Sequence, residues 1–183
     1  MTISAEVVTP SIGSRIDIDV ASLLAPAAAG ELRQLLVQRG VLVLKKIHLS
    51  DEQQRTLAAL MGNVRDEGER GVYKITLDSR VSPRADYLKG SFLWHLDGTH
   101  EDTPVFASLL SGRVLSKVGG RTEFANSYLA YEELPQGMKD RIDRLEVVHS
   151  VETSMRRAGI EASEDNLADW RRRPADPVCT TRT

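Results

Sequence analysis

A histidine and an aspartate two residues apart are the side chains of this sequence with the clearest potential for chemistry. They are His95 and Asp97, in the segment Trp94-His95-Leu96-Asp97. Residues 91–97 predict a β-strand, and alternate residues of a strand point to the same face. The imidazole nitrogen and the carboxylate oxygen would therefore converge on one point. Such a pair of donors suits a divalent first-row metal ion.

Two protein ligands do not complete a metal site. One more histidine would make the pair into the 2-His-1-carboxylate arrangement, which leaves positions open for a co-substrate and dioxygen. The alternative is a polar strand face on which His95 and Asp97 share a hydrogen bond, and spacing alone does not exclude it. Gly98 would allow backbone or substrate to approach closely. Residues 119–122, Gly-Gly-Arg-Thr, predict either a simple hairpin turn or a turn followed by a hydroxyl that binds a carboxylate.

The elements that must position these residues are marked by periodicity and by end signals. In the N-terminal part, the pattern predicts a strand at 16–20 and a helix that runs from Pro26 to a Gly40 cap. A covered central strand is expected at 41–44. The next helix should begin with a Ser50–Gln53 capping box and end at Gly62. Further strands are expected at 72–77, 91–97, 105–115, 122–124 and 145–151. Short helices are expected after Asn126 and Pro135, and residues 78–90 predict a mobile connection.

The chain has 183 residues, which is enough for a single domain over residues 1–183. Residues 152–183 hold many charges and few large apolar side chains, so we expect them to be weakly structured. The formal net charge of −2 excludes a broad field that would attract nucleic acid or an anionic membrane. No apolar run is long enough to span a bilayer. The single cysteine, Cys179, excludes an internal disulfide and suits the reducing cytoplasm.

Several motifs, in order and with matching spacing from about Ile12 to about Ser150, resemble one family. They are residues 39–44 (RGVLVL), 49–54 (LSDEQQ), 94–99 (WHLDGT), 107–115 (ASLLSGRVL), 119–126 (GGRTEFAN) and 130–135 (AYEELP). The family is the taurine dioxygenase/2,4-dichlorophenoxyacetate dioxygenase (TauD/TfdA) family of Fe(II)- and 2-oxoglutarate-dependent dioxygenases. The ordered combination is far more specific than any one of the motifs.

The resemblance implies a mainly β fold with flanking helices: a double-stranded β-helix, or jelly roll, here incomplete. It implies that His95 and Asp97 are iron ligands and that Thr122 donates a hydrogen bond to the 2-oxoglutarate co-substrate. It also implies that Ser91 lies near the substrate. Arg121 stands where the family commonly has an acidic residue.

The implied function is oxidation of a C–H bond of a small organic acid, sulfonate or related molecule by dioxygen, with release of succinate and carbon dioxide. Relatives place a second metal histidine and a 2-oxoglutarate-binding arginine further along the chain than Thr183. We therefore expect an N-terminal part of a dioxygenase domain, whose open sheet edges need a partner polypeptide or a homo-oligomer. The alternatives are an inactive remnant or binding module, and a small metal protein that uses His149 as third ligand.

Overall fold

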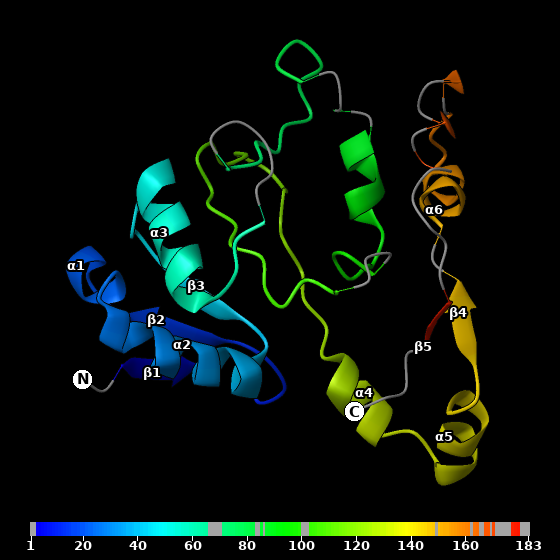
Figure 1. Ribbon diagram of the computed structural model, residues 1–183, viewed down its shortest axis with the longest axis horizontal. Coiled ribbons are helices and arrows are strands. Elements are labelled where there is room, and N and C mark those ends of the chain that lie inside the picture. Colours follow the sequence, from blue (N-terminus) through cyan, green and yellow to red (C-terminus); the bar gives the residue numbers. More distant parts are fainter. Residues whose placement is uncertain are drawn as a thin grey trace. The chain divides into compact units, whose positions relative to one another are not determined.

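The computed structural model describes residues 3–65, 71–82, 85, 87–99, 103–148, 150–161, 163–164, 167–168, 170 and 177–179. The chain forms two compact units. Unit 1 comprises Met1–Tyr73 and Leu109–Leu134, and unit 2 comprises Lys74–Ser108 and Pro135–Thr183. Each unit has helices and a small sheet of its own (Figure 1). The expected single domain stays a prediction.

Unit 1 is built on a three-stranded sheet with the order β1-β2-β3. Strand β1 (Ser4–Val7) pairs antiparallel with β2 (Ser14–Asp17), and β2 pairs parallel with β3 (Leu42–Leu44). The strand expected at 16–20 thus begins and ends earlier. The expectation of a covered central strand at 41–44 is wrong, because β3 lies at the end of the described sheet and its three residues are half-buried.

The helices of unit 1 begin and end where their local signals indicate. Helix α1 (Val20–Leu23) precedes α2 (Pro26–Arg39), which ends at Gly40 with a φ of 70°. Helix α3 (Asp51–Met61) begins with the expected capping box: the Gln53 N–H donates to Ser50 Oγ, and the Ser50 N–H donates to Gln53 Oε1. The core gathers between these helices and the sheet, and its members are Ile3, Ile16, Leu23, Ala28, Leu32, Leu49 and Leu57.

The last element of unit 1 is α4 (Ser127–Glu132), which the Asn126 side chain caps by accepting from the Leu129 N–H. The described residues include no strand at 105–115 or 122–124, so these two expectations are wrong. An extended segment becomes a strand only where a neighbouring strand takes its backbone hydrogen bonds. Apolar composition indicates a tendency to extend but does not supply that neighbour.

Unit 2 contains the 3₁₀ helix η1 (Tyr87–Phe92), helix α5 (Gln136–Ile142), strand β4 (Glu146–Val148), helix α6 (Val151–Arg157) and strand β5 (Pro177–Cys179). Strands β4 and β5 pair antiparallel, and α6 packs against η1, where Leu88 and Met155 are buried. Most of α6 lies in the segment expected to be weakly structured. The strands expected at 72–77 and 91–97 do not form: Val72 is an isolated bridge residue, residues 91 and 92 end η1, and residues 73–77 and 93–97 belong to no helix or strand.

The described residues therefore contain more helix than strand. The expected predominance of β-structure is not seen in them, and their two small sheets do not form a jelly roll. Among the same residues, none of the helices has the length and apolarity that a bilayer crossing needs.

Candidate metal site

His95 and Asp97 lie in unit 2, directly after η1 and at the start of a turn. They do not share a strand face, so the geometric reason for expecting them to converge is wrong. The chain reverses here instead, and His95 Nε2 lies 3.4 Å from Asp97 Oδ1. The two side chains expected to form a site are thus brought together by a turn.

The imidazole of His95 is oriented by its own backbone neighbourhood. Its Nδ1 lies 2.7 Å from the carbonyl oxygen of Leu93. A carbonyl oxygen can only accept, so Nδ1 carries the proton and donates it. In the neutral form of the ring the free lone pair is then on Nε2, which faces the carboxylate. A hydrogen bond from the outer nitrogen to a carbonyl is the usual way in which a metal-binding histidine is held.

The carboxylate of Asp97 is held from the other side. Ser108 Oγ donates to Asp97 Oδ2 at 2.8 Å, while Oδ1 faces His95. Gly98 has a φ of +69°, and a Cβ there would lie 2.7 Å from Val105 Cγ2. The expected close approach at Gly98 is therefore made by Val105 of the same chain. Together these contacts close the loop from Asp97 to Ser108.

The His95 Nε2 and Asp97 Oδ1 atoms face each other at 3.4 Å, and with the imidazole in its neutral form they present two lone pairs to one region of space. A proton on Nε2 or a metal ion between the two atoms would stabilise this arrangement, and an imidazole nitrogen with a carboxylate oxygen suits Fe(II), Mn(II) or a similar ion. The side chains are about half exposed, at 48% and 57%, so a ligand can reach them. The chemistry of the pair therefore fits two positions of a metal site.

No group of three or more histidine, cysteine, aspartate or glutamate side chains suited to a metal occurs in the part of the chain that the structure describes. His149, the third ligand in one alternative, lies outside the described residues, as does His100. That alternative stays a prediction.

The two other expected site residues lie in different units. Ser91 is on η1 in unit 2, where its hydroxyl donates to the Leu88 carbonyl at 2.6 Å and keeps its lone pairs for a further donor. Thr122 lies in unit 1, in an exposed stretch outside helices and strands. Because Thr122 and Ser91 belong to different compact units, their roles stay predictions: Thr122 as a co-substrate contact and Ser91 as a substrate contact.

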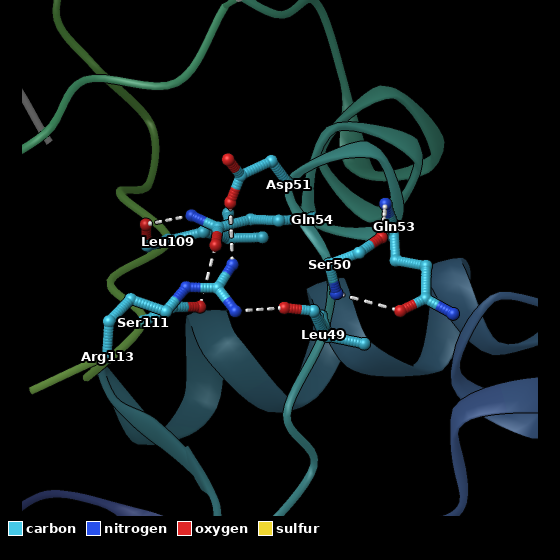
Figure 2. Close-up of polar contacts among 8 residues, drawn as sticks. All are labelled: Leu49, Ser50, Asp51, Gln53, Gln54, Leu109, Ser111 and Arg113. Atoms are coloured by element: carbon cyan, nitrogen blue, oxygen red, sulfur yellow. Dashed lines mark hydrogen bonds and ion pairs between the residues drawn. The ribbon is translucent and has the colours of Figure 1, made fainter.

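Figure 2 shows how residues 109–113 are tied to the start of α3 within unit 1. The side-chain amide of Gln54 donates to the Leu109 carbonyl at 2.9 Å and accepts from Ser111 Oγ at 2.6 Å. The Gln54 amide thereby donates a hydrogen bond to a backbone carbonyl of this segment, as a neighbouring strand would otherwise do. We call the side-chain contacts of Gln54 and Arg113 to this segment and to the start of α3 the α3 clamp.

The second half of the α3 clamp is Arg113 (Figure 2). Its guanidinium donates to the Leu49 carbonyl and lies 2.7 Å from Asp51 Oδ1. Arg113 therefore satisfies a backbone carbonyl just before α3 and an acidic side chain in the first turn of that helix. The clamp fixes the segment that directly follows Ser108 in the sequence.

Sequence reasoning missed two groups around the pair: the Leu93 carbonyl and the Ser108 hydroxyl. The carbonyl has no sequence signal, because every residue carries one. Ser108 belongs to the motif at 107–115, but its contact with Asp97 spans eleven positions and depends on the loop between them. No helical or strand periodicity predicts a contact at that spacing.

A family model and several known proteins match this chain over most of its length. The family model described as "Taurine catabolism dioxygenase TauD, TfdA family" matches residues 4–182. The (S)-phenoxypropionate/alpha-ketoglutarate-dioxygenase of Sphingobium herbicidovorans is 29% identical over 139 residues, which are 70% of this chain and 47% of that protein. The alpha-ketoglutarate-dependent sulfate ester dioxygenase of Pseudomonas putida is 32% identical over 143 residues, 74% of this chain and 43% of that protein.

A solved structure, AAD-2 in complex with Mn(II) and N-oxalylglycine, superposes with a TM-score of 0.80 at 26% identity, covering 97% of this chain and 67% of that one. The chain spans about half the length of the curated relatives it matches. The fold, the family model and the relatives agree, and the chain belongs to the TauD/TfdA family.

Proposed function

We propose that this chain is the N-terminal part of an Fe(II)- and 2-oxoglutarate-dependent dioxygenase, and that it supplies two of the metal ligands. The observation that carries the proposal is the convergence of His95 Nε2 and Asp97 Oδ1 at 3.4 Å. Membership of the family and the printed alpha-ketoglutarate dependence of the relatives support the cofactor assignment. The Mn(II) and N-oxalylglycine in the similar AAD-2 structure support it as well.

In this proposal His95 and Asp97 hold the iron. Bound iron, with 2-oxoglutarate and dioxygen, supplies the oxidising power that converts a substrate C–H bond and releases succinate and carbon dioxide. The chain's own groups have simpler tasks. His95 offers a lone pair because Leu93 holds the proton on Nδ1, and Asp97 offers a negative charge that favours a cation.

Thr122 is the residue that we propose as a hydrogen-bond donor to a carboxylate of 2-oxoglutarate. Ser91 is proposed as a substrate contact, since it lies four residues before His95 and its oxygen can still accept a hydrogen bond. The substrate class we propose is a small organic anion. Phenoxypropionate and sulfate esters, named for the relatives, both carry an anionic group beside an oxidisable carbon chain.

We further propose that the complete fold is a jelly roll, which this chain forms together with additional polypeptide. Apolar side chains of unit 1 lie almost fully open to solvent, with Val114 93% and Val118 89% exposed. Such exposure is typical of surfaces that other protein covers. The chain alone should therefore bind a dye for exposed apolar surface, and its soluble fraction should increase when Val114 and Val118 are replaced by serine.

The test of the activity joins residues 1–182 to the C-terminal remainder of the (S)-phenoxypropionate relative, and measures succinate formed with Fe(II), 2-oxoglutarate and ascorbate. We expect succinate from this chimera. The His95→Ala version should form none above background. Equal succinate formation by both would contradict the assignment of His95 as an iron ligand.

A second candidate function is a metal-binding module without turnover. It is favoured by the finding that no third acidic, histidine or cysteine side chain joins the pair within the described part of the chain. Metal binding by the chain, with no succinate from the chimera, would favour this candidate over the dioxygenase.

A further inference from the structure

We propose that Ser108 is a positioning residue for the metal pair, and that its hydroxyl keeps Asp97 a one-oxygen ligand whose Oδ1 is aimed at His95 Nε2. The inference rests on the proposed function, because it assigns a role within the same site. It goes beyond that function by naming a residue outside the ligand set and the geometry that this residue imposes.

An aspartate side chain can present its carboxylate in more than one way. A carboxylate has two equivalent oxygens, and rotation about its last bond exchanges them or presents both to a metal ion. In this structure the two oxygens have different partners. Oδ2 accepts from Ser108 Oγ at 2.8 Å, and Oδ1 lies 3.4 Å from His95 Nε2. Ser108 therefore selects which oxygen faces the imidazole.

The position of Ser108 is itself determined by packing in the loop. Gly98 turns the chain with a positive φ, and Val105 packs so closely that a Cβ on Gly98 would meet its side chain and its backbone nitrogen, at 2.7 and 3.3 Å. This contact brings residues 105–108 back towards Asp97. The hydroxyl of Ser108 thus reaches Oδ2 because of the close approach of Val105 to Gly98.

The two side chains of the pair are oriented in the same way, each by a hydrogen bond at its outer atom. The Leu93 carbonyl fixes the outer nitrogen of His95, and the Ser108 hydroxyl fixes the outer oxygen of Asp97. Both inner atoms, Nε2 and Oδ1, face each other and are available to a metal ion. Outer hydrogen bonds of this kind orient metal ligands, and their removal lowers the metal affinity.

The first experiment measures Mn(II) affinity of the full chain by electron paramagnetic resonance. Ser108→Ala should weaken binding about three- to tenfold, less than the effect at a buried site because His95 and Asp97 are half exposed. Ser108→Thr keeps the hydroxyl and should stay within about twofold of the wild type. Ser22→Ala is the matched control, since it removes a serine-to-aspartate side-chain hydrogen bond from unit 1.

A purely structural role for Ser108 would lower the melting temperature without changing the metal geometry. The absorption spectrum of the Co(II)-loaded chain separates the two roles. When the alanine variant frees Oδ2 to join the metal, the coordination number rises and the visible absorption should weaken. An unchanged Co(II) spectrum together with unchanged Mn(II) affinity in Ser108→Ala would overturn the proposal.

A second experiment uses the metal-free chain, so that it decides the inference even if the chain binds no metal. The ring ¹⁵N and ¹H resonances of His95 report the nearby carboxylate. They should shift in Ser108→Ala and match the wild type in Ser108→Thr and Ser22→Ala. Identical His95 resonances in all four proteins would refute the positioning role. Absent Mn(II) binding with shifted resonances would refute the proposed metal function alone.

Discussion

Replacing Gln54 by alanine tests whether side chains of α3 hold the segment that follows the metal loop. Gln54 makes two hydrogen bonds to that segment, one to the Leu109 carbonyl and one from Ser111 Oγ, and both are partly buried. Each contributes about 1 kcal/mol net. Alanine is a better helix former by a few tenths of a kcal/mol. The expected loss of unfolding free energy is therefore about 1.5–2 kcal/mol.

Two measurements check this value. A change of 1 kcal/mol shifts the melting temperature of a chain of this size by about 2–4 °C, so Gln54→Ala should melt about 3–8 °C lower, followed by circular dichroism. Amide hydrogen exchange should also accelerate most in the peptide that contains residues 109–113, because the local opening that exposes it becomes easier.

Two variants make the prediction specific. Gln34→Ala makes the same change at an exposed position of α2 and should alter the free energy of unfolding by less than about 0.5 kcal/mol. Ser111→Ala should destabilise the wild type but add little in the Gln54→Ala background, because its partner is already gone. The clamp interpretation fails if Gln54→Ala destabilises no more than Gln34→Ala, or if the two clamp substitutions are simply additive.

Three further outcomes follow from named contacts. Gly98→Ala forces a positive φ on a residue with a Cβ and presses that Cβ against Val105. Urea denaturation should show a loss of about 1–2 kcal/mol of unfolding free energy, and the Mn(II) affinity should fall. An unchanged Mn(II) affinity would show that this turn does not position His95 and Asp97. Leu32→Ala, at a core position that is 2% exposed, should cost about 2–5 kcal/mol in the same assay, and a value below 1 kcal/mol would contradict the described core. The hydroxyl and backbone N–H of Ser22 lower the pKa of Asp19. The ionised Asp19 side chain therefore stabilises the fold fully above the ordinary carboxyl pKa of about 3.9, and this stabilisation is lost as the pH falls through the lower folded-state pKa. The stability difference between wild type and Asp19→Ala should shrink in acid, and a difference that grew in acid would refute the lowered pKa.

The sequence predicted α2, α3, α4 and α5 well because their signals are local, whereas the helices at Val20–Leu23 and Val151–Arg157 were not expected. Pro26 and Gly40 bracket α2, the Ser50–Gln53 capping box begins α3, and Asn126 caps α4, as the structure shows. Each signal acts within one or two turns of the chain. Neighbours far away in the sequence are not needed to make it work.

Strands were predicted poorly for the opposite reason. The apolar segments at 72–77 and 105–115 have the composition of strands, but the described residues offer them no strand to pair with. Part of the second segment is instead held by side chains of Gln54 and Arg113. A strand is a property of two segments, and a pattern in one of them cannot specify the other.

The candidate site was found for a reason that is partly wrong. The residue types of His95 and Asp97 indicated metal chemistry, and the two side chains do converge. They converge through a turn, however, and not along a strand. The groups that orient them, the Leu93 carbonyl and Ser108, could be identified only once the loop closed by Gly98 and Val105 was known.

The most direct test of the account is Mn(II) binding by the chain and by variants of the pair, measured by electron paramagnetic resonance at one temperature and buffer. We expect His95→Ala and Asp97→Ala each to weaken binding at least about tenfold. His48→Asn, which removes an exposed imidazole from unit 1, should leave the affinity unchanged. Equal Mn(II) affinity in the wild type, His95→Ala and Asp97→Ala would contradict the claim that these two side chains form a metal site.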